Sequence, residues 1–501
     1  MMKRLLILVI AVFMAVSLFS CSSGKKNPAA SSENTTLSTE STDITNDYNP
    51  NLEAIDGHGK VIKVLTRESA ITANYWYEEM DSEKGDRNNI VDSKVFTRNS
   101  LIEDKYHVVL ECHAINYNQI ASTIDTQIRS METEENSYQI VLPMLVHAFN
   151  IANNGFCHSI DELEKVNPEK PYWRGDIYTA TTIGNKNYFI SGDINTSVYG
   201  SSWTTFFNEE IVKSYNIENP YEIVKDGDWT LEKMLTLSKD FGGDNGDGIF
   251  DNNDNYAICS GTWVWQCFLY GSNLKLIDKD IDDIPFLVTE DATKREMLQD
   301  VLVQTVEIMN DQTLSINSNK AGISSQPSQL FCRGQVLFYF ANVNNAFVEN
   351  DIKDMSQEYG MLPLPKRNDS QDYYSNAVHP HHSSTVIVPS NIPTESLGLI
   401  SSVLEDLAYY SYEYVKPAYY DTVITYRSVR NEDSFEMMPY IFEHFDIDFG
   451  LIMTDTFGFD TEFRNKILNN DVNFSSYLTS YTSLWKIALE NVVKTYGGEK
   501  K

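Results

Sequence analysis

Cysteine is scarce in this chain of 501 residues, which contains only six. One of them, Cys21, stands close to the N-terminus. The other five are an odd set at irregular spacings without a C-x-x-C pair, which excludes a regular disulfide framework. We expect buried free thiols, with a bridge as the alternative. The five are Cys112, Cys157, Cys259, Cys267 and Cys332.

Basic residues are also few. Lys and Arg total 39 against 71 Asp and Glu, which gives a formal net charge of −32. So acidic a chain repels the phosphates of nucleic acids and anionic lipid surfaces, and we exclude both as ligands. The same charge is ordinary for a secreted protein.

The motifs of common enzymes are missing. The sequence contains no Gly-x-Ser-x-Gly elbow, no His-Glu-x-x-His helix and no phosphate-binding loop. Carboxylate pairs such as Glu78-Glu79 and Glu209-Glu210 occur, but nothing marks one carboxyl of a pair as the acid of raised pKa that a glycosidase requires. We therefore expect no catalytic residues and no required cofactor.

The only long apolar run lies at the N-terminus. Residues 5–16 follow Lys3 and Arg4 and are short for a membrane span, so residues 1–20 are predicted to be a secretory signal. Leu18-Phe19-Ser20-Cys21 resembles a lipobox, which implies that Cys21 becomes the acylated mature N-terminus. Residues 21–56, rich in Ser, Thr, Asn and Glu, are predicted to be a disordered tether. We expect an extracytoplasmic protein that its acyl chains hold to the outer face of the cell membrane.

The folded part opens with strands and helices in alternation. Strands are predicted at 61–65, 108–110 and 138–142, and helices at 91–106 and 115–131. This spacing indicates an α/β fold with a parallel sheet and right-handed crossovers. Ligands of such sheets bind beyond the carboxyl ends of the strands. The loops that hold Tyr75, Trp76 and Met144 are therefore candidate ligand-binding segments.

The stretch 201–261 carries a distinctive order of parts. A strand ends at Asn208, a short helix follows over 209–215, and Thr230 caps a second helix that Gly242-Gly243 stops. An acidic loop and a strand at 256–258 complete it. This order resembles the family 1 extracellular solute-binding proteins of bacterial ABC importers.

Later segments strengthen the resemblance, which covers nearly the whole chain after residue 57. The matching segments are Phe331-Cys332-Arg333-Gly334 with the strand up to Phe340, Tyr359-Gly360-Met361-Leu362-Pro363-Leu364-Pro365, and the C-terminal patterns at 407–412, 415–421 and 430–434. The resemblance implies a two-lobed fold of the type II periplasmic-binding class, with discontinuous lobes, a hinge and a cleft between them. The first lobe would comprise 57–194 and 357–405, and the second 195–356 and 406–501. The strand that begins at Tyr359 is expected in the first lobe.

The resemblance also implies a function. Proteins of this family capture a solute and deliver it to importer permease subunits, and we expect a monomer that does so for a carbohydrate, with an oligosaccharide as the expected ligand. Two alternatives stay open: a surface sensor or adhesion protein that uses the same fold without transport, and a polysaccharide hydrolase.

Aromatic residues in polar loops favour a saccharide ligand, because sugar rings pack on aromatic faces and sugar hydroxyls need polar partners. Core packing is the alternative for each tryptophan taken singly. The predicted ligand-binding residues are Tyr75, Trp76, Met144, Tyr199, Trp203, Trp263 and Trp265.

Two segments resemble metal sites. In the loop 243–254, Asn245, Asp247, Asp251 and Asp254 occupy positions of a calcium loop, but Gly243 stands where the first ligand belongs. A structural calcium ion and a solvated acidic turn are both compatible with this pattern. For His379-Pro380-His381-His382 a polar loop at the cleft rim is favoured over a metal site.

Overall fold

The computed structural model describes residues 48–68, 79–80, 90–322, 327–347, 352–420, 432–445 and 447–497. The predicted signal and Cys21 lie outside the described residues, as do Tyr75 and Trp76. The contacts divide the chain into Met1–Asp47 and Tyr48–Lys501, and every described residue belongs to the second of these units.

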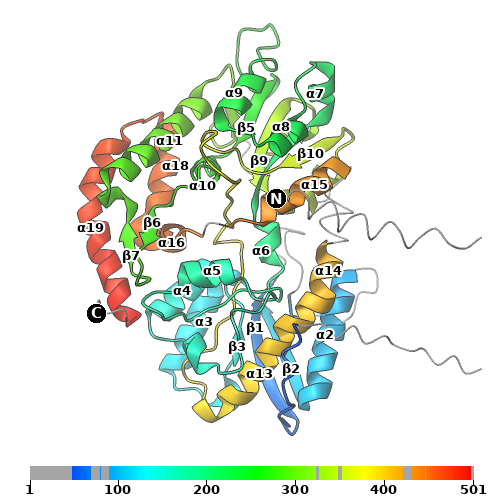
Figure 1. Cartoon of the computed structure of the whole chain (residues 1–501), viewed down its shortest axis with the longest axis vertical. Coiled ribbons are helices and arrows are strands. Elements are labelled where there is room, and N and C mark those ends of the chain that lie inside the picture. Colours follow the sequence, from blue (N-terminus) through cyan, green and yellow to red (C-terminus); the bar gives the residue numbers. More distant parts are fainter. Residues whose placement is uncertain are drawn as a thin grey trace, which may run out of the picture. The chain divides into compact units, whose positions relative to one another are not determined.

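The first lobe is a small parallel sheet flanked by helices (Figure 1). Its elements are β1 (Lys60–Arg67), α2 (Ile90–Tyr106), β2 (Val108–Ile115), α3 (Tyr117–Arg129), β3 (Ile140–Val141), α4 (Leu145–Asn153), α5 (Gly175–Thr181) and α13 (Thr394–Tyr410), with 3-10 turns at Glu134–Asn136 and Ile160–Glu162. The strand order is β2-β1-β3, and all pairs are parallel. The strands and helices predicted for this region are confirmed, with ends that differ by a few residues.

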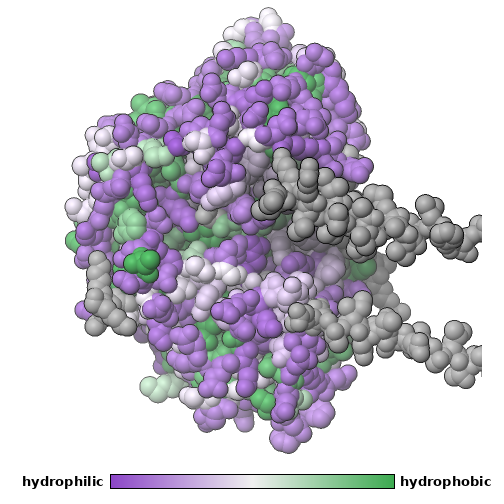
Figure 2. All heavy atoms as spheres, viewed as in Figure 1, coloured by the Kyte–Doolittle hydropathy of each residue, from purple (hydrophilic) through white to green (hydrophobic). Residues whose placement is uncertain are grey.

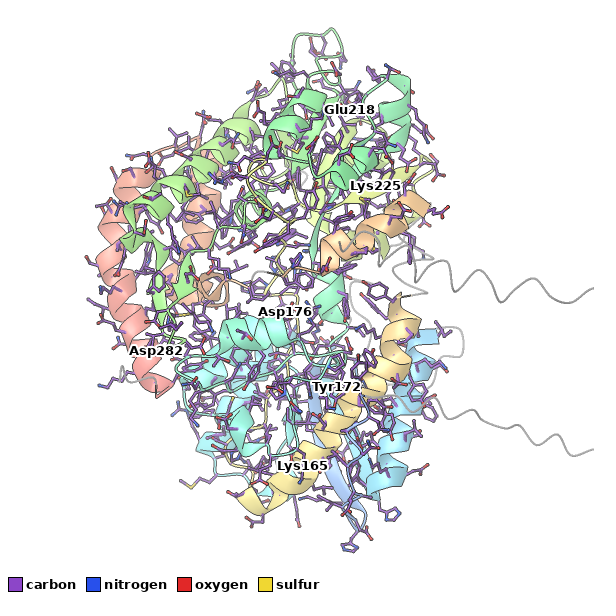
Figure 3. The ribbon with its side chains drawn as sticks, viewed as in Figure 1. Lys165, Tyr172, Asp176, Glu218, Lys225 and Asp282 are labelled. Carbon is purple, nitrogen blue, oxygen red and sulfur yellow. The ribbon has the colours of Figure 1, made fainter. Side chains whose placement is uncertain are left out.

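Side chains of β1 alternate between two cores. Ile62 and Val64 belong to a core that α13 covers, whereas Leu65 belongs to a larger core that continues into the second lobe. Two buried carboxylates of α13 are satisfied within the first lobe: Glu405 accepts hydrogen bonds from Tyr172 Oη and Trp173 Nε1, and Asp406 accepts one from Tyr106 Oη. Tyr172 lies beside α13 in Figure 3.

The second lobe is a five-stranded mixed sheet. Its elements are β4 (Trp203–Asn208), α7 (Glu209–Ser214), α8 (Pro220–Asp226), α9 (Leu231–Ser238), β5 (Tyr256–Ser260), α10 (Val264–Gly271), α11 (Ala292–Asn310), β8 (Ser315–Asn317), α12 (Gln329–Cys332), β9 (Val336–Asn342) and β10 (Tyr359–Leu362), with 3-10 turns at Val288–Glu290, Val343–Phe347 and Ile352–Asp354. The strand order is β10-β4-β9-β5-β8. β4 is antiparallel to β10 and β9, whereas β5 is parallel to β9 and β8. The predicted cap of α9 is confirmed, because Thr230 Oγ1 accepts the Lys233 N–H at 3.1 Å.

A hairpin and a C-terminal helical layer complete this lobe. The hairpin pairs β6 (Ile277–Lys279) with β7 (Pro285–Leu287), and the helices are α15 (Glu432–Phe442), α16 (Phe449–Ile452), α17 (Thr454–Phe457), α18 (Phe459–Asn469) and α19 (Phe474–Thr495). Asp448 anchors the hairpin, since its buried carboxylate accepts the backbone N–H groups of Leu276 and Ile277. Figure 2 shows a mostly hydrophilic face with apolar side chains gathered along α19 and β7.

The chain crosses between the lobes three times. The first crossing, 191–202, contains α6 (Ser197–Gly200) and leads into β4. The second returns from Val378, which bridges Ser202, to Ser384, which bridges Met144. The third follows the π-helical turn Ser411–Val415 and α14 (Lys416–Tyr419) and leads into α15.

One predicted assignment is wrong. The strand Tyr359–Leu362 lies in the second lobe, where it pairs with β4, and not in the first. The lobe boundary predicted between 405 and 406 also falls inside α13, which runs on to Tyr410. The other boundaries stay predictions.

The described cysteines form no disulfide bond, as expected. Cys157, Cys259 and Cys267 are buried, and Cys112 and Cys332 are half-buried. Among the helices formed by described residues, none has both the length and the apolar character of a membrane span.

Candidate functional site

The strand ends of both lobes meet the crossing segments. β1 ends at Arg67, and β3 leads into Met144, which bridges Ser384 of the second crossing. In the second lobe, β5, β8 and β9 are parallel, so Ser260, Asn317 and Asn342 end at one edge of the sheet. Ligands of open α/β sheets bind at such edges.

A buried polar cluster ties the crossings to the end of β1. We call Arg67, Glu79, Asn195, Ser197 and Ser384 the hinge cluster; each is at most 5 % exposed. One oxygen of the Glu79 carboxylate accepts the Ser197 N–H at 2.9 Å, and the other accepts the Ser384 hydroxyl at 2.6 Å. Asn195 Nδ2 donates to the same hydroxyl at 2.8 Å. Glu79 therefore joins the first and second crossings.

Arg67 supplies the positive charge of the hinge cluster. Its Nη2 lies 3.7 Å from a Glu79 carboxylate oxygen, and its Nη1 donates to the His382 carbonyl at 2.8 Å. Burial lowers the pKa of the Arg67 guanidinium, and the charge of Glu79 opposes that shift. The charge of Glu79 thus helps to keep the buried Arg67 guanidinium protonated.

Tyr199 belongs to a second tie between the lobes. Its hydroxyl donates to Asp193 at 2.6 Å, and Lys416 Nζ lies 3.3 Å from the other oxygen of Asp193. The Tyr199 ring contacts Tyr420 and Phe442 at centroid distances of 5.7 and 5.9 Å. Burial raises the pKa of Asp193, and Lys416 opposes the shift. These contacts favour a structural role for Tyr199, whose hydroxyl is already engaged.

Trp203 and the histidines of the second crossing form a row of rings. The Trp203 ring lies 5.4 Å from that of His379, which stacks on His382 at 4.0 Å and 16°. Burial holds the pKa of His379 well below its usual value and lowers that of His382 to about 3. Both imidazoles are therefore neutral at pH 7 and present uncharged ring faces, while their Nδ1 atoms are engaged: His379 Nδ1 accepts the His381 N–H at 3.3 Å, and His382 Nδ1 lies 3.1 Å from Asn342 Oδ1.

Several buried polar atoms near these strand ends have no hydrogen-bond partner within the described part of the chain. A buried polar group without a partner costs free energy, so each atom is a place for a water molecule or a ligand hydroxyl. They are His147 Nδ1, Trp203 Nε1, Asn317 Nδ2, Ser318 Oγ, Asn344 Nδ2 and Ser383 Oγ. We call these six residues the cleft polar set.

Charge interactions connect the cleft polar set to α17 and α18. His147, on α4 of the first lobe, interacts electrostatically with His381 and with Asp455. His381 in turn interacts with Asp455, Asp460 and Arg464. Side chains from both lobes therefore face the second crossing.

Trp263 immediately precedes α10 and Trp265 lies in its first turn, and the two indoles have different surroundings. Trp263 is half-buried, with its Nε1 3.4 Å from the Phe340 carbonyl oxygen, at the end of β5. Trp265 is fully buried, donates to Asp460 at 3.1 Å and contacts the Phe463 ring at 5.0 Å. The burial favours the core alternative for Trp265. Met144 is also buried, at the end of β3.

The acidic loop satisfies its own backbone. Asp254 is buried, and its two oxygens accept the N–H groups of Asn245 and Asp251 at 2.8 and 2.7 Å. Asp247 accepts the Ile249 N–H at 2.8 Å. No group of three His, Cys, Asp or Glu among the described residues is placed to hold a metal ion, in this loop or at the histidines. Carboxylates of the loop thus bind its own backbone N–H groups, and the choice between a calcium ion and an acidic turn stays a prediction.

Residue-by-residue reading of the sequence missed most of the cleft polar set. Asn317 ends β8 and Asn344 follows β9 at the sheet edge, and a polar residue at the end of a buried strand is the available signal. His147 carries no local signal, since its role depends on contacts with a segment more than 200 residues later.

No protein-family model matches the chain, and no curated protein matches it. Solved structures do. The fold is that of the two-lobed solute-binding proteins of ABC transporters.

Three structures illustrate the likeness. An ABC substrate-binding protein from Listeria monocytogenes in complex with cycloalternan is 13 % identical, with 88 % of this chain and 100 % of that one covered and a TM-score of 0.51. A sugar transporter protein from Rhizobium etli in an open conformation is 14 % identical, with 88 % and 100 % covered and a TM-score of 0.53. A solute-binding protein from Thermotoga lettingae bound with α-D-tagatose is 13 % identical, with 87 % and 100 % covered and a TM-score of 0.52.

Proposed function

We propose that this protein binds a carbohydrate between its lobes and delivers it to the permease subunits of an ABC importer. The observation that carries the proposal is the cleft polar set beside the Trp203–His379 rings. Neutral aromatic faces pack against the C–H faces of a sugar, and unpaired N–H and O–H groups match its hydroxyls. The saccharides bound by two of the structures of the same fold support this ligand class.

The proposed delivery role includes a membrane anchor. Cys21 would carry the acyl chains, and residues 21–56 would tether the monomeric binding unit to the outer face of the cell membrane. The protein would act without catalysis and without a cofactor. Of the residues predicted from the sequence, Trp203 and Trp263 are the ones we retain for ligand contact, with Tyr75 and Trp76 untested.

A saccharide panel tests the proposal. Melting temperature is measured with mono- and oligosaccharides, and calorimetry then follows the hits. Trp203→Phe removes the Nε1–H and keeps an aromatic ring, and Asn344→Ala removes the unpaired amide. Because each loses about one hydrogen bond, we expect each to weaken binding roughly tenfold.

Asn491→Ala, at an exposed position of α19, is the matched control and should bind like the wild type. A panel in which no saccharide binds would overturn the proposed ligand class. Binding in the panel with no saccharide uptake in cells would instead favour the sensor alternative.

A further inference from the structure

The hairpin β6–β7 of the second lobe contacts the first lobe directly. Lys279 Nζ donates to the carbonyl oxygens of Thr179 and Thr182, the latter at 3.1 Å. These carbonyls lie at the C-terminal end of α5, where helix carbonyls lack intrahelical partners and the helix dipole favours a cation. A backbone bond from the Gly184 N–H to the Asp283 carbonyl, at 3.2 Å, strengthens the contact.

Tyr496 makes a second contact between the lobes. It follows α19, is 1 % exposed, and its ring meets Tyr188 edge-on at 4.9 Å and Phe149 at 6.1 Å. Phe149 lies on α4, and Tyr188 precedes the first crossing. We call Lys279 and Tyr496 with these first-lobe partners the latch.

The latch lies at one end of the boundary between the lobes, away from α6 and α14 of the crossings (Figure 1). In Figure 1, β7 and the C-terminus stand at one side of the view, whereas α6 and α14 stand at the other. Asp282, at the turn of the hairpin, is labelled beside the end of α19 in Figure 3. Rotation of one lobe about the crossings would therefore separate the latch contacts first.

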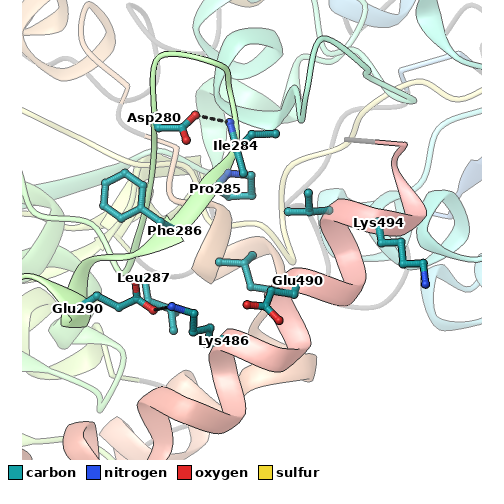
Figure 4. Close-up of a pocket in the computed structure, with 11 residues that line it drawn as sticks. Asp280, Ile284, Pro285, Phe286, Leu287, Glu290, Lys486, Glu490 and Lys494 are labelled. Carbon is teal, nitrogen blue, oxygen red and sulfur yellow. Dashed lines mark hydrogen bonds and ion pairs between the residues drawn. The ribbon is translucent and has the colours of Figure 1, made fainter. Parts of the chain in front are cut away.

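The hairpin is held firmly on its own lobe. Asp280 accepts the Ile284 N–H at 2.9 Å inside the turn, and Asp448 fixes the base of the hairpin. Its other face borders a groove of about 390 Å³ against α19, closed at one end by the Glu290–Lys486 ion pair (Figure 4). Because the hairpin is fixed to the second lobe, its contact with the first lobe restrains the position of the whole second lobe.

We infer that Lys279 and Tyr496 are positioning residues that hold the lobes closed and thereby set carbohydrate affinity from outside the site. The inference rests on the proposed function. Contacts made only in the closed form raise its population, and a ligand that binds the closed form gains apparent affinity in proportion. Loss of a latch contact should therefore weaken binding and speed release without removing any ligand contact.

The test compares Lys279→Met and Tyr496→Ala with Lys165→Met, an exposed control in the first lobe that Figure 3 labels. Hydrogen exchange of residues 179–186 and small-angle scattering are recorded without ligand. We expect exchange to rise at least about threefold in both latch variants and the radius of gyration to increase. With a saccharide from the panel, affinity should fall roughly fivefold, mainly through faster dissociation.

The inference is overturned if both latch variants keep wild-type hydrogen exchange and wild-type scattering, whether or not their affinity for the saccharide falls. Should Tyr496→Ala fail to fold, Lys279→Met alone decides, because it removes a charge from a partly exposed position. If no saccharide binds, the proposed function fails, while the ligand-free measurements still decide on the latch.

Discussion

The hinge cluster and the latch both join the two lobes, but they are built differently. In the hinge cluster, each oxygen of the Glu79 carboxylate has a hydroxyl or N–H partner, and every member is at most 5 % exposed. The latch has one ammonium group on helix-end carbonyls and one aromatic ring in an apolar contact. Buried networks with several shared hydrogen bonds are rigid, whereas a few separate contacts can break and re-form.

This difference indicates which contacts persist when the lobes move. The hinge cluster must survive opening, because it fixes the crossings that both forms share. The latch must break at a low free-energy cost, or the ligand could not leave. Matched substitutions at the hinge and at the latch should therefore change the free energy of unfolding by unequal amounts.

The largest effect is expected from Glu79→Gln. It removes the charge that faces the buried Arg67 guanidinium at 3.7 Å, so we expect the free energy of unfolding to fall by about 3–5 kcal/mol. Urea denaturation measures the change. Glu210→Gln, at an exposed position of α7, is the control, and its free energy of unfolding should stay within about 0.5 kcal/mol of the wild-type value. A loss below about 1 kcal/mol for Glu79→Gln would remove the distinction between hinge and latch.

A pH effect is expected on the latch side, at the base of the hairpin. Burial raises the pKa of Asp448 from 3.8 to about 6, although backbone N–H groups of Leu276, Gly450 and Ile277 oppose the shift. The folded state then holds a proton between pH 4 and 6 that the unfolded state releases. The contribution of Asp448 to the free energy of unfolding is therefore most favourable below pH 4 and is lost as the pH rises to about 6. The loss amounts to at most roughly 3 kcal/mol.

Asp448→Asn isolates that contribution. The difference in unfolding free energy between the wild type and the variant, measured from pH 4 to 7, should shift against the wild type as pH rises. Equal pH profiles for the two proteins would show that Asp448 does not titrate in this range.

The smallest effect comes from a matched pair of tyrosines. Tyr199→Phe deletes a hydroxyl that donates to buried Asp193 and should cost about 1–2 kcal/mol of unfolding free energy. Tyr496→Phe deletes a buried hydroxyl that has no partner among the described residues, and should change it by less than about 0.5 kcal/mol. Thermal melts compare the two variants, and equal losses would contradict the assignment of Tyr199 to a polar tie and of Tyr496 to an apolar contact.

The sequence predicted what depends on local pattern. The strands and helices from β1 to α3 follow from periodicity, and the Thr230 cap follows from one side chain and a nearby N–H. The lobe of the strand at Tyr359 was assigned wrongly, because an apolar strand carries no information about which sheet it joins.

Site contacts were harder to predict, because they join distant segments. Glu79 and Ser384 are 305 residues apart, and no spacing rule connects them. Trp263 and Trp265 share the same polar flanks, yet the indole of Trp263, just before α10, lies at the strand end, and that of Trp265, within α10, lies in the core. The aromatic content indicated a saccharide, but it could not separate these two roles.

The most direct test of the account is hydrogen exchange of the wild type with and without a bound saccharide, followed in the same peptide map at residues 179–186 and 191–202. Ligand should slow exchange several-fold in the latch segment 179–186 and leave the hinge segment 191–202 nearly unchanged. Equal protection of both segments, or protection of 191–202 alone, would contradict a fixed hinge opposed by a reversible latch.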